Sequence, residues 1–141
     1  MSRKLRIIIV GAGIGGLAAA RALNLRGHEV EVYERATTLG EVGAGLQVGP
    51  SAVKVLYALG LETPLHSVAC APDCFATFNW LDAKLLHREP YQETFKSYGA
   101  PYLTAHRADL HKLLLARVPE NLIHLNTVSY THLTLPTNRE V

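Results

Sequence analysis

The chain has 141 residues, of which 48% are hydrophobic and 18% charged, with a formal net charge of +2. This length is that of one domain with a single modest core. A charge this near neutral, without a basic block, argues against nucleic acid as a partner. No apolar run approaches the roughly 20 residues that cross a bilayer, and no secretory leader is visible, so we expect no membrane contact. The only two cysteines are expected as free thiols, which favours a reducing, cytoplasmic location.

The first predicted elements are a strand, a glycine turn, a helix and a second strand. Residues 5–10 are apolar and rich in β-branched side chains, as in a buried parallel strand. Residues 14–26 have apolar side chains at helical spacing and end at Gly27. Residues 29–34 alternate in polarity as a second strand does. This order predicts a βαβ unit of a Rossmann-type α/β fold.

The turn after the first strand carries Gly11, Gly13 and Gly16 in the spacing G-x-G-x-x-G. That spacing is a weak signal alone, but between a strand and a helix it indicates dinucleotide binding. Gly13 leaves bare backbone where a pyrophosphate approaches, and Gly16 lets the helix lie tightly on the strand. The helix N-terminus then offers unpaired N–H groups to the phosphates. A tight turn without a ligand is the alternative.

Glu34 ends the second predicted strand. Its carboxylate can accept hydrogen bonds from the hydroxyls of an adenosine ribose, and it would repel a 2′-phosphate, which argues against NADP at this site. FAD and NAD share that ribose, so the βαβ unit does not separate them. Residues 39–61 favour FAD over NAD. They are dense in glycine before a helix predicted from Pro50 to Gly60, as in backbone that wraps a flat ring. An NAD dehydrogenase would continue instead into another helix and parallel strand.

The middle of the chain, residues 64–105, predicts an insertion of irregular strands, and residues 121–126 predict a third parallel strand. Cys70 and Cys74 are expected as buried free thiols, and the seven histidines lack metal spacing, so no metal site is predicted. The aromatic residues of the insertion are expected mainly in the core, with an aromatic pocket as the alternative. They are Phe75, Phe78, Trp80 and Tyr102.

Four segments, VGAGIGGLAAA, VEVYERA, GAGLQVGPSAVKVL and YLTAHRADLHKLL, resemble the class A flavoprotein aromatic hydroxylases. These FAD-dependent monooxygenases include salicylate and 6-hydroxynicotinate hydroxylases. The resemblance implies bound FAD, NADH or NADPH as co-substrate, O2 and a small aromatic acid as substrate. A flavin-dependent dehydrogenase and a nonenzymatic dinucleotide-binding module are the alternatives. The sequence names neither the aromatic substrate nor the oligomeric state, and it does not choose between NADH and NADPH.

The resemblance implies cofactor contacts but no catalytic residue. It matches four glycines to the pyrophosphate, an acid and an arginine to the adenosine side, a backbone segment to the isoalloxazine ring, and a second arginine to the phosphate and ribitol. In that order the residues are Gly11, Gly13, Gly15 and Gly16; Glu34 and Arg35; Gly45, Leu46 and Gln47; and Arg107.

Two of these matches also have arguments of their own. Arg107 falls in the first turn of a helix predicted over 107–117, where the helix dipole disfavours a cation, so an anion should lie nearby. Asp109 is the local alternative to the cofactor phosphate. Gln47 stands where some members have a histidine, and glutamine cannot act as a base. A generic aromatic substrate is therefore expected rather than hydroxynicotinate.

We divide the chain into residues 1–127, the first part of an FAD-binding domain, and residues 128–141. The latter, VSYTHLTLPTNREV, contain none of the family's later motifs and are interpreted as a non-native tail; a genuine short strand is the alternative. We therefore expect an N-terminal fragment without hydroxylase activity of its own, whose incomplete sheet leaves an unpaired edge.

Overall fold

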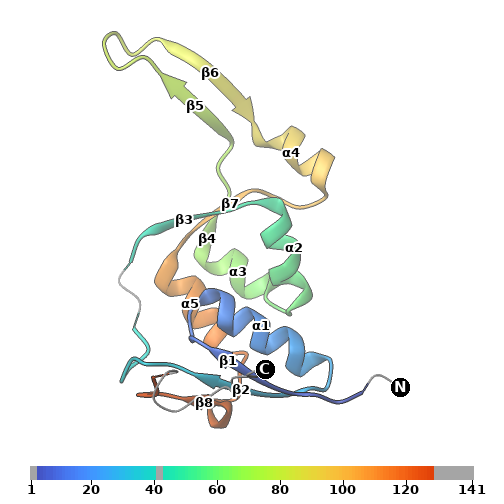
Figure 1. Cartoon of the computed structure of the whole chain (residues 1–141). Helices are drawn as coiled ribbons and strands as arrows, with labels where there is room; N and C mark the ends of the chain where they lie inside the picture. The colour runs from blue at the N-terminus through green and yellow to red at the C-terminus, as the bar shows by residue number, and fades with distance from the viewer. Residues whose placement is uncertain (1–2, 41–42, 129–141) are drawn as a thin grey trace, which may run out of the picture. The chain divides into compact units, whose positions relative to one another are not determined.

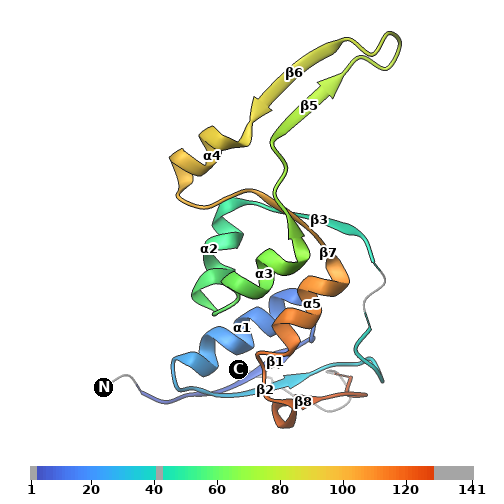
Figure 2. The same ribbon diagram turned by 180° about the vertical axis from the view of Figure 1, so that it is seen from behind.

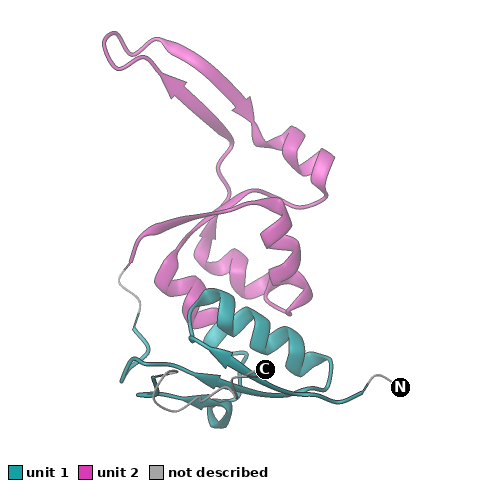
Figure 3. Cartoon of the chain, in the orientation of Figure 1, with its two compact units in different colours: residues 1–41, 114–141 teal, residues 42–113 magenta. Residues whose placement is uncertain are grey.

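The computed structural model describes residues 3–40 and 43–128. The chain forms two compact units, one of residues 1–41 with 114–141 and the other of residues 42–113 (Figure 3). Each mixes helices and strands, which confirms the predicted α/β class. The tail interpreted as non-native lies, except for Val128, outside the described residues.

The first unit is built on a parallel three-stranded sheet with β2 in the middle. Every residue of β1 pairs with one of β2, from Arg6 opposite Glu29 to Val10 opposite Tyr33, and the short β8 pairs with the other edge of β2. Helix α1 lies along one face of β1 and β2 (Figures 1 and 2). The predicted βαβ unit and third parallel strand are thus confirmed. The elements are β1 (Arg6–Val10), α1 (Ile14–Leu25), β2 (Glu29–Tyr33), the 3-10 turn η1 (Glu120–Leu122) and β8 (Ile123–His124).

The two faces of this sheet differ because side chains alternate along each strand. On β2, Val30 and Val32 are 2% and 0% exposed, whereas Glu31 between them points to the other face. There the Arg6 Nη2 donates to Glu31 Oε1 at 2.9 Å and the Tyr33 hydroxyl donates to Glu31 Oε2 at 2.6 Å. The buried face therefore supplies the core of the unit. The opposite face is exposed and mixed, because it carries Ile8 and Val10 of β1 beside these hydrogen-bonded side chains.

The glycine turn shows which glycines the backbone itself requires. Gly11 has a φ of +100°, a conformation that other residues rarely adopt. A β-carbon at Gly16 would collide with the carbonyl oxygen of Gly11 and would lie 3.5 Å from the Ile9 Cγ2. Gly13, the extended N-cap of α1, has nothing within 4 Å of the position a β-carbon would take. Gly11 and Gly16 thus serve the turn, whereas the open space at Gly13 is not used by the fold.

The second unit contains an antiparallel sheet in the order β3-β7-β4 and a separate hairpin of β5 and β6. Its buried core includes Val48 and Leu103, which face each other across β3 and β7. None of the described helices of the chain is long and apolar enough to cross a membrane. The elements are β3 (Gly45–Val48), α2 (Pro50–Ala58), α3 (Glu62–Val68), β4 (Ala69–Cys70), β5 (Cys74–Phe78), β6 (Leu85–Pro90), α4 (Tyr91–Tyr98), β7 (Leu103–His106) and α5 (Arg107–Leu115), whose last two residues belong to the first unit.

Burial in the insertion differs from expectation. Cys70 and Cys74 are free thiols, but Cys70 is exposed and Cys74 only half-buried. Trp80 is 88% exposed and Phe78 57% exposed, so they are not core residues. For Cys74 and the aromatic residues the reason is that β5 and β6 pair only with each other, and among the described residues no further strand joins this two-stranded ribbon, whereas Cys70 lies on the edge strand β4. An isolated ribbon cannot bury its side chains against itself.

The region expected to hold only irregular strands also contains α4 and most of α3. Helix α4 begins after its N-cap Pro90 and ends at Tyr98, followed by its C-cap Gly99, whose φ is +66°. None of its residues is buried. Gly99 therefore ends the helix through a backbone conformation that other residues rarely adopt, and a helix of 8 residues shows little more than two turns of periodic pattern in the sequence.

The glycine turn generates a matched pair of substitutions. Gly16→Ala should lower the free energy of unfolding by about 1–3 kcal/mol, the range for overpacking, because its β-carbon meets backbone. Gly15→Ala, one residue earlier in the same helix turn, meets nothing within 4 Å and should be neutral or stabilising by up to about 1 kcal/mol. Urea unfolding measures both, and equal effects would contradict the close approach of α1 to Gly11.

Candidate functional site

A hollow of about 310 Å³ lies in the first unit where β1 and β2 end. Open parallel sheets bind ligands beyond the carboxyl ends of their strands, so its position is that of a ligand site. The sequence predicted three of its residues, Gly11, Glu34 and Arg35, and missed the other four. Val10 and Tyr33 were expected only as strand residues, Thr127 had no motif to mark it, and Val128 falls in the segment interpreted as a non-native tail. The lining residues are Val10, Gly11, Tyr33, Glu34, Arg35, Thr127 and Val128.

The Glu34 carboxylate joins the glycine turn to the end of β2. Its Oε2 accepts the N–H of Ala12 at 2.7 Å and its Oε1 accepts the N–H of Ala36 at 2.9 Å. The Ala36 N–H, followed by the Ala12 N–H, lowers the pKa of Glu34 from its ordinary value. Each carboxylate oxygen has two lone pairs, so each can still accept a bond from a ligand hydroxyl. Glu34 is therefore an ionised acceptor at the rim of the hollow.

Backbone hydrogen bonds hold the segment after β8 against the end of β2. The Glu34 N–H donates to the His124 carbonyl at 2.9 Å, and the Thr127 N–H donates to the Glu34 carbonyl at 2.9 Å. The His124 ring stacks on Tyr33 with a centroid separation of 4.7 Å. These contacts bring Thr127 to the same hollow as the glycine turn.

The N-terminus of α1 carries no side-chain cap. Gly13 is the N-cap, no side-chain hydrogen bond caps the helix, and its first turn contains no acidic residue. The first N–H groups of a helix have no partners within the helix, and with the helix dipole they favour an anion. The turn can therefore bind a phosphate beside the open space at Gly13.

The remaining predicted residues lie in the second unit. Gly45, Leu46 and Gln47 form most of β3, and Arg107 begins α5 directly after β7. The Arg107 N–H donates to the Ala44 carbonyl at 2.9 Å, so antiparallel pairing brings Arg107 beside the Gly45 segment. The local alternative partner of Arg107, Asp109, has its Oδ1 3.8 Å from the Lys112 Nζ.

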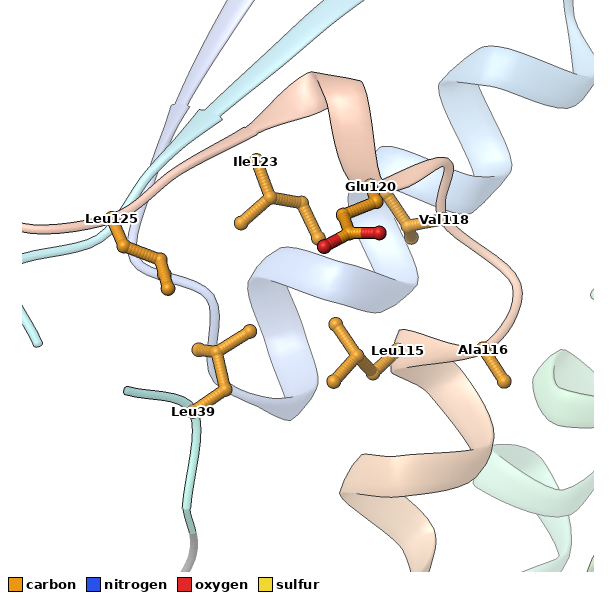
Figure 4. Close-up of a pocket in the computed structure, with 7 residues that line it drawn as sticks. All are labelled: Leu39, Leu115, Ala116, Val118, Glu120, Ile123 and Leu125. Carbon is orange, nitrogen blue, oxygen red and sulfur yellow. The ribbon is translucent and has the colours of Figure 1, made fainter. Parts of the chain in front are cut away.

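A larger hollow of about 430 Å³ in the first unit contains no predicted site residue. Figure 4 shows aliphatic side chains around it, with the Glu120 carboxylate as the one charged group among those that line it. The residues are Leu39, Leu115, Ala116, Val118, Glu120, Ile123 and Leu125. No group of three or more His, Cys, Asp or Glu side chains in the described part of the chain could hold a metal ion. The hollow at the strand ends is thus the better candidate, because polar groups converge there.

The lowered pKa of Glu34 gives a pH-dependent prediction. An acid whose pKa is lower in the folded state stabilises the fold above its ordinary pKa, and this contribution disappears as the pH falls through the folded pKa. Glu34→Gln should lower the free energy of unfolding at pH 7 by about 1 kcal/mol, a charged hydrogen-bond contribution reduced by partial exposure. Urea unfolding should show this difference shrinking below about pH 4. A difference that stays constant from pH 7 to pH 3 would contradict the role of the charge.

The sequence matches known oxidoreductases. Residues 9–54 match the family described as the NAD(P)-binding Rossmann-like domain. The chain is 40% identical over 124 residues to 6-hydroxynicotinate 3-monooxygenase of Pseudomonas fluorescens, which covers 87% of this chain and 32% of that protein. It is 41% identical over 117 residues to 3-hydroxybenzoate 6-hydroxylase of Polaromonas naphthalenivorans, which covers 82% of this chain and 29% of that protein. The chain thus spans about a third of the length of these relatives.

Solved structures share the fold. Klebsiella pneumoniae HpxO complexed with FAD and uric acid matches 87% of this chain and 31% of its own length, with a TM-score of 0.78 and 24% identity. The tetrameric form of 2-methyl-3-hydroxypyridine-5-carboxylic acid oxygenase matches 89% of this chain and 32% of its own, with a TM-score of 0.73 and 26% identity. Over the length that it spans, the chain is therefore similar in sequence to enzymes named as aromatic monooxygenases and hydroxylases, and it shares the fold of FAD-bound structures.

Proposed function

We propose that the chain binds FAD and that the first unit holds its adenosine and pyrophosphate. The observation that carries this proposal is the open space at Gly13 beside the uncapped N-terminus of α1, with the ionised Glu34 tied to the same turn. Such a turn supplies N–H donors for phosphates and an acceptor for ribose hydroxyls. The match of the sequence to FAD-dependent enzymes favours FAD over NAD as the bound dinucleotide.

Each predicted residue has one role in this proposal. The turn glycines and the α1 N–H groups bind the pyrophosphate, the Glu34 carboxylate accepts the ribose hydroxyls, and Arg35 lies along the adenosine. In the second unit, the β3 backbone borders the flavin ring, and Arg107 provides a cation for the anionic part of the cofactor. The residues are Gly11, Gly13, Gly15, Gly16, Glu34 and Arg35 in the first unit, and Gly45, Leu46, Gln47 and Arg107 in the second.

We further propose that the activity served by this segment is hydroxylation of a small aromatic acid with NADH or NADPH and O2. Two relatives are named for hydroxylation of the aromatic acids 6-hydroxynicotinate and 3-hydroxybenzoate. When bound, FAD supplies the redox chemistry, and the protein supplies binding and orientation. Gln47 cannot act as a base, so its side chain is assigned hydrogen bonding only.

The open space at Gly13 predicts a variant that loses the cofactor but keeps the fold. Gly13→Val should reduce FAD affinity by more than about 100-fold, since its branched side chain occupies the space that the pyrophosphate needs, a loss of roughly 3 kcal/mol or more. Its free energy of unfolding should stay within about 1 kcal/mol of wild type, because the residue is extended and meets no atoms. Flavin fluorescence titration and urea unfolding measure the two quantities.

Gly49→Val is the matched control for that experiment. Gly49 is likewise an extended N-cap, of α2, with nothing within 4 Å of a β-carbon, but it lies outside the proposed site. This variant should retain FAD affinity. If Gly13→Val bound FAD with the affinity of wild type, the proposal that the glycine turn binds the pyrophosphate would be wrong.

The proposed reaction is tested by following electrons and oxygen separately. A polypeptide that carries this segment with the remaining length of its relatives should be reduced by NADH without O2 and then form a hydroxylated aromatic acid when O2 is admitted. Residues 1–141 alone should show no substrate-dependent NADH oxidation with hydroxybenzoates or hydroxypyridines. Oxidised product without incorporated oxygen would favour a dehydrogenase, and hydroxylation by residues 1–141 would contradict the fragment interpretation.

A further inference from the structure

The sheet of the second unit has one buried face and one polar face. Val48 pairs with Leu103, and both are buried. The alternate pairs, Gln47 with Thr104 and Gly45 with His106, therefore have their side-chain positions on the opposite face. Gln47 and His106 are exposed there. Cross-strand pairing thus places a histidine on the same face as the segment assigned to the flavin.

Two glycines lie near His106, and the space around them differs. The α-carbon of Gly43 lies so close to the ring that a β-carbon there would collide with its Nε2 and Cε1 and lie 3.2 Å from its Cδ2. Gly45, directly opposite His106, has nothing within 4 Å of a β-carbon position. Gly43 therefore makes room for the imidazole, whereas the space at Gly45 is not needed by the fold and remains open to a ligand.

The backbone around His106 is anchored on both sides. The pairing of Leu46 with Ala105 and of Gly45 with His106 continues into the bond from the Arg107 N–H to the Ala44 carbonyl at 2.9 Å. The imidazole is exposed, so hydrophobic burial does not account for its position against Gly43. What this arrangement offers is a hydrogen-bonding aromatic ring at a defined place beside an open backbone segment.

We propose that His106 is a flavin-contacting residue. This inference rests on the proposed function, in which Gly45, Leu46 and Gln47 border the flavin ring. An isoalloxazine is flat and carries carbonyl oxygens and an N–H along its pyrimidine edge, and an imidazole has one donor and one acceptor to meet them. His106 then determines how the flavin ring sits on β3, with Gly43 keeping the imidazole in reach.

The test is FAD titration of the 141-residue chain, in which flavin fluorescence measures the affinity and visible absorption records the spectrum of the bound flavin. His106→Ala should weaken FAD binding by about fivefold to tenfold, the scale of one hydrogen bond, and shift the visible bands. His106→Gln, which keeps a donor and an acceptor, should recover part of the affinity. His87→Ala, at an exposed histidine of β6, is the control and should bind FAD as wild type does.

Gly43→Ala provides a second route to the same result. Its β-carbon displaces the imidazole while leaving His106 in the sequence, so it should weaken FAD binding as His106→Ala does. The double variant should bind no more weakly than His106→Ala alone, because both changes remove one contact. The free energy of unfolding in urea without FAD identifies any variant that binds FAD weakly because its fold is destabilised. If His106→Ala is such a variant, the FAD affinities of His106→Gln and Gly43→Ala test the flavin contact instead.

The two proposals fail in different ways. No FAD binding by the wild-type chain overturns the proposed function and this inference with it. Binding by wild type with unchanged affinity and spectrum in both His106→Ala and Gly43→Ala overturns this inference alone. Weakened binding in both, with recovery in His106→Gln, supports the flavin contact.

Discussion

The close approach between Gly16 and the carbonyl oxygen of Gly11 sets the geometry of the first unit. A β-carbon at Gly16 would occupy the place of that oxygen, so α1 can lie at this distance only because the position is glycine. The positive φ of Gly11 turns the chain from β1 into the helix. As a consequence, the N-terminus of α1 comes directly to the end of β1, where its unpaired N–H groups are available to an anion.

Glu34 ties this turn to the end of β2 mainly through backbone hydrogen bonds. Backbone N–H groups of Ala12 and Ala36 keep the carboxylate ionised, and the same bonds hold the turn against the end of β2. The carboxylate thus stays charged mainly through neutral backbone donors, with a smaller contribution from the Arg35 cation. In the proposed function, the carboxylate and the N–H groups of the α1 N-terminus contact different parts of one dinucleotide.

The sheet of the second unit is antiparallel, and its two faces differ. Its antiparallel strands bury one face and leave the other to Gln47, Thr104 and His106. The hairpin of β5 and β6 has no covering layer among the described residues, which accounts for the exposure of Phe78 and Trp80. The aromatic residues of this part of the chain were therefore not a reliable indication of which positions are buried.

Local features were predictable from the sequence because their causes are local. The apolar run of β1, the helical spacing of α1 and the steric demands of Gly11 and Gly16 act within a few residues, and the structure has each where the sequence indicates. Glu34 at the end of β2 followed from strand alternation. The Gly13 site, the Arg35 contact and the flavin segment remain predictions that the FAD experiments test.

Other features were decided only by the tertiary structure, because they depend on pairing between distant segments. The arrival of Thr127 at the strand ends, the exposure of the thiols and the position of His106 opposite Gly45 all follow from strand register and from which layers meet. Register is set by the sum of many contacts across the fold rather than by the residues next to each position. By itself, the sequence determined the strand, the glycine turn and the helix after it, because glycine sterics and helix ends are local, and its resemblance to known enzymes indicated FAD. The residues that surround the turn were decided by the fold, because they come from distant segments of the chain.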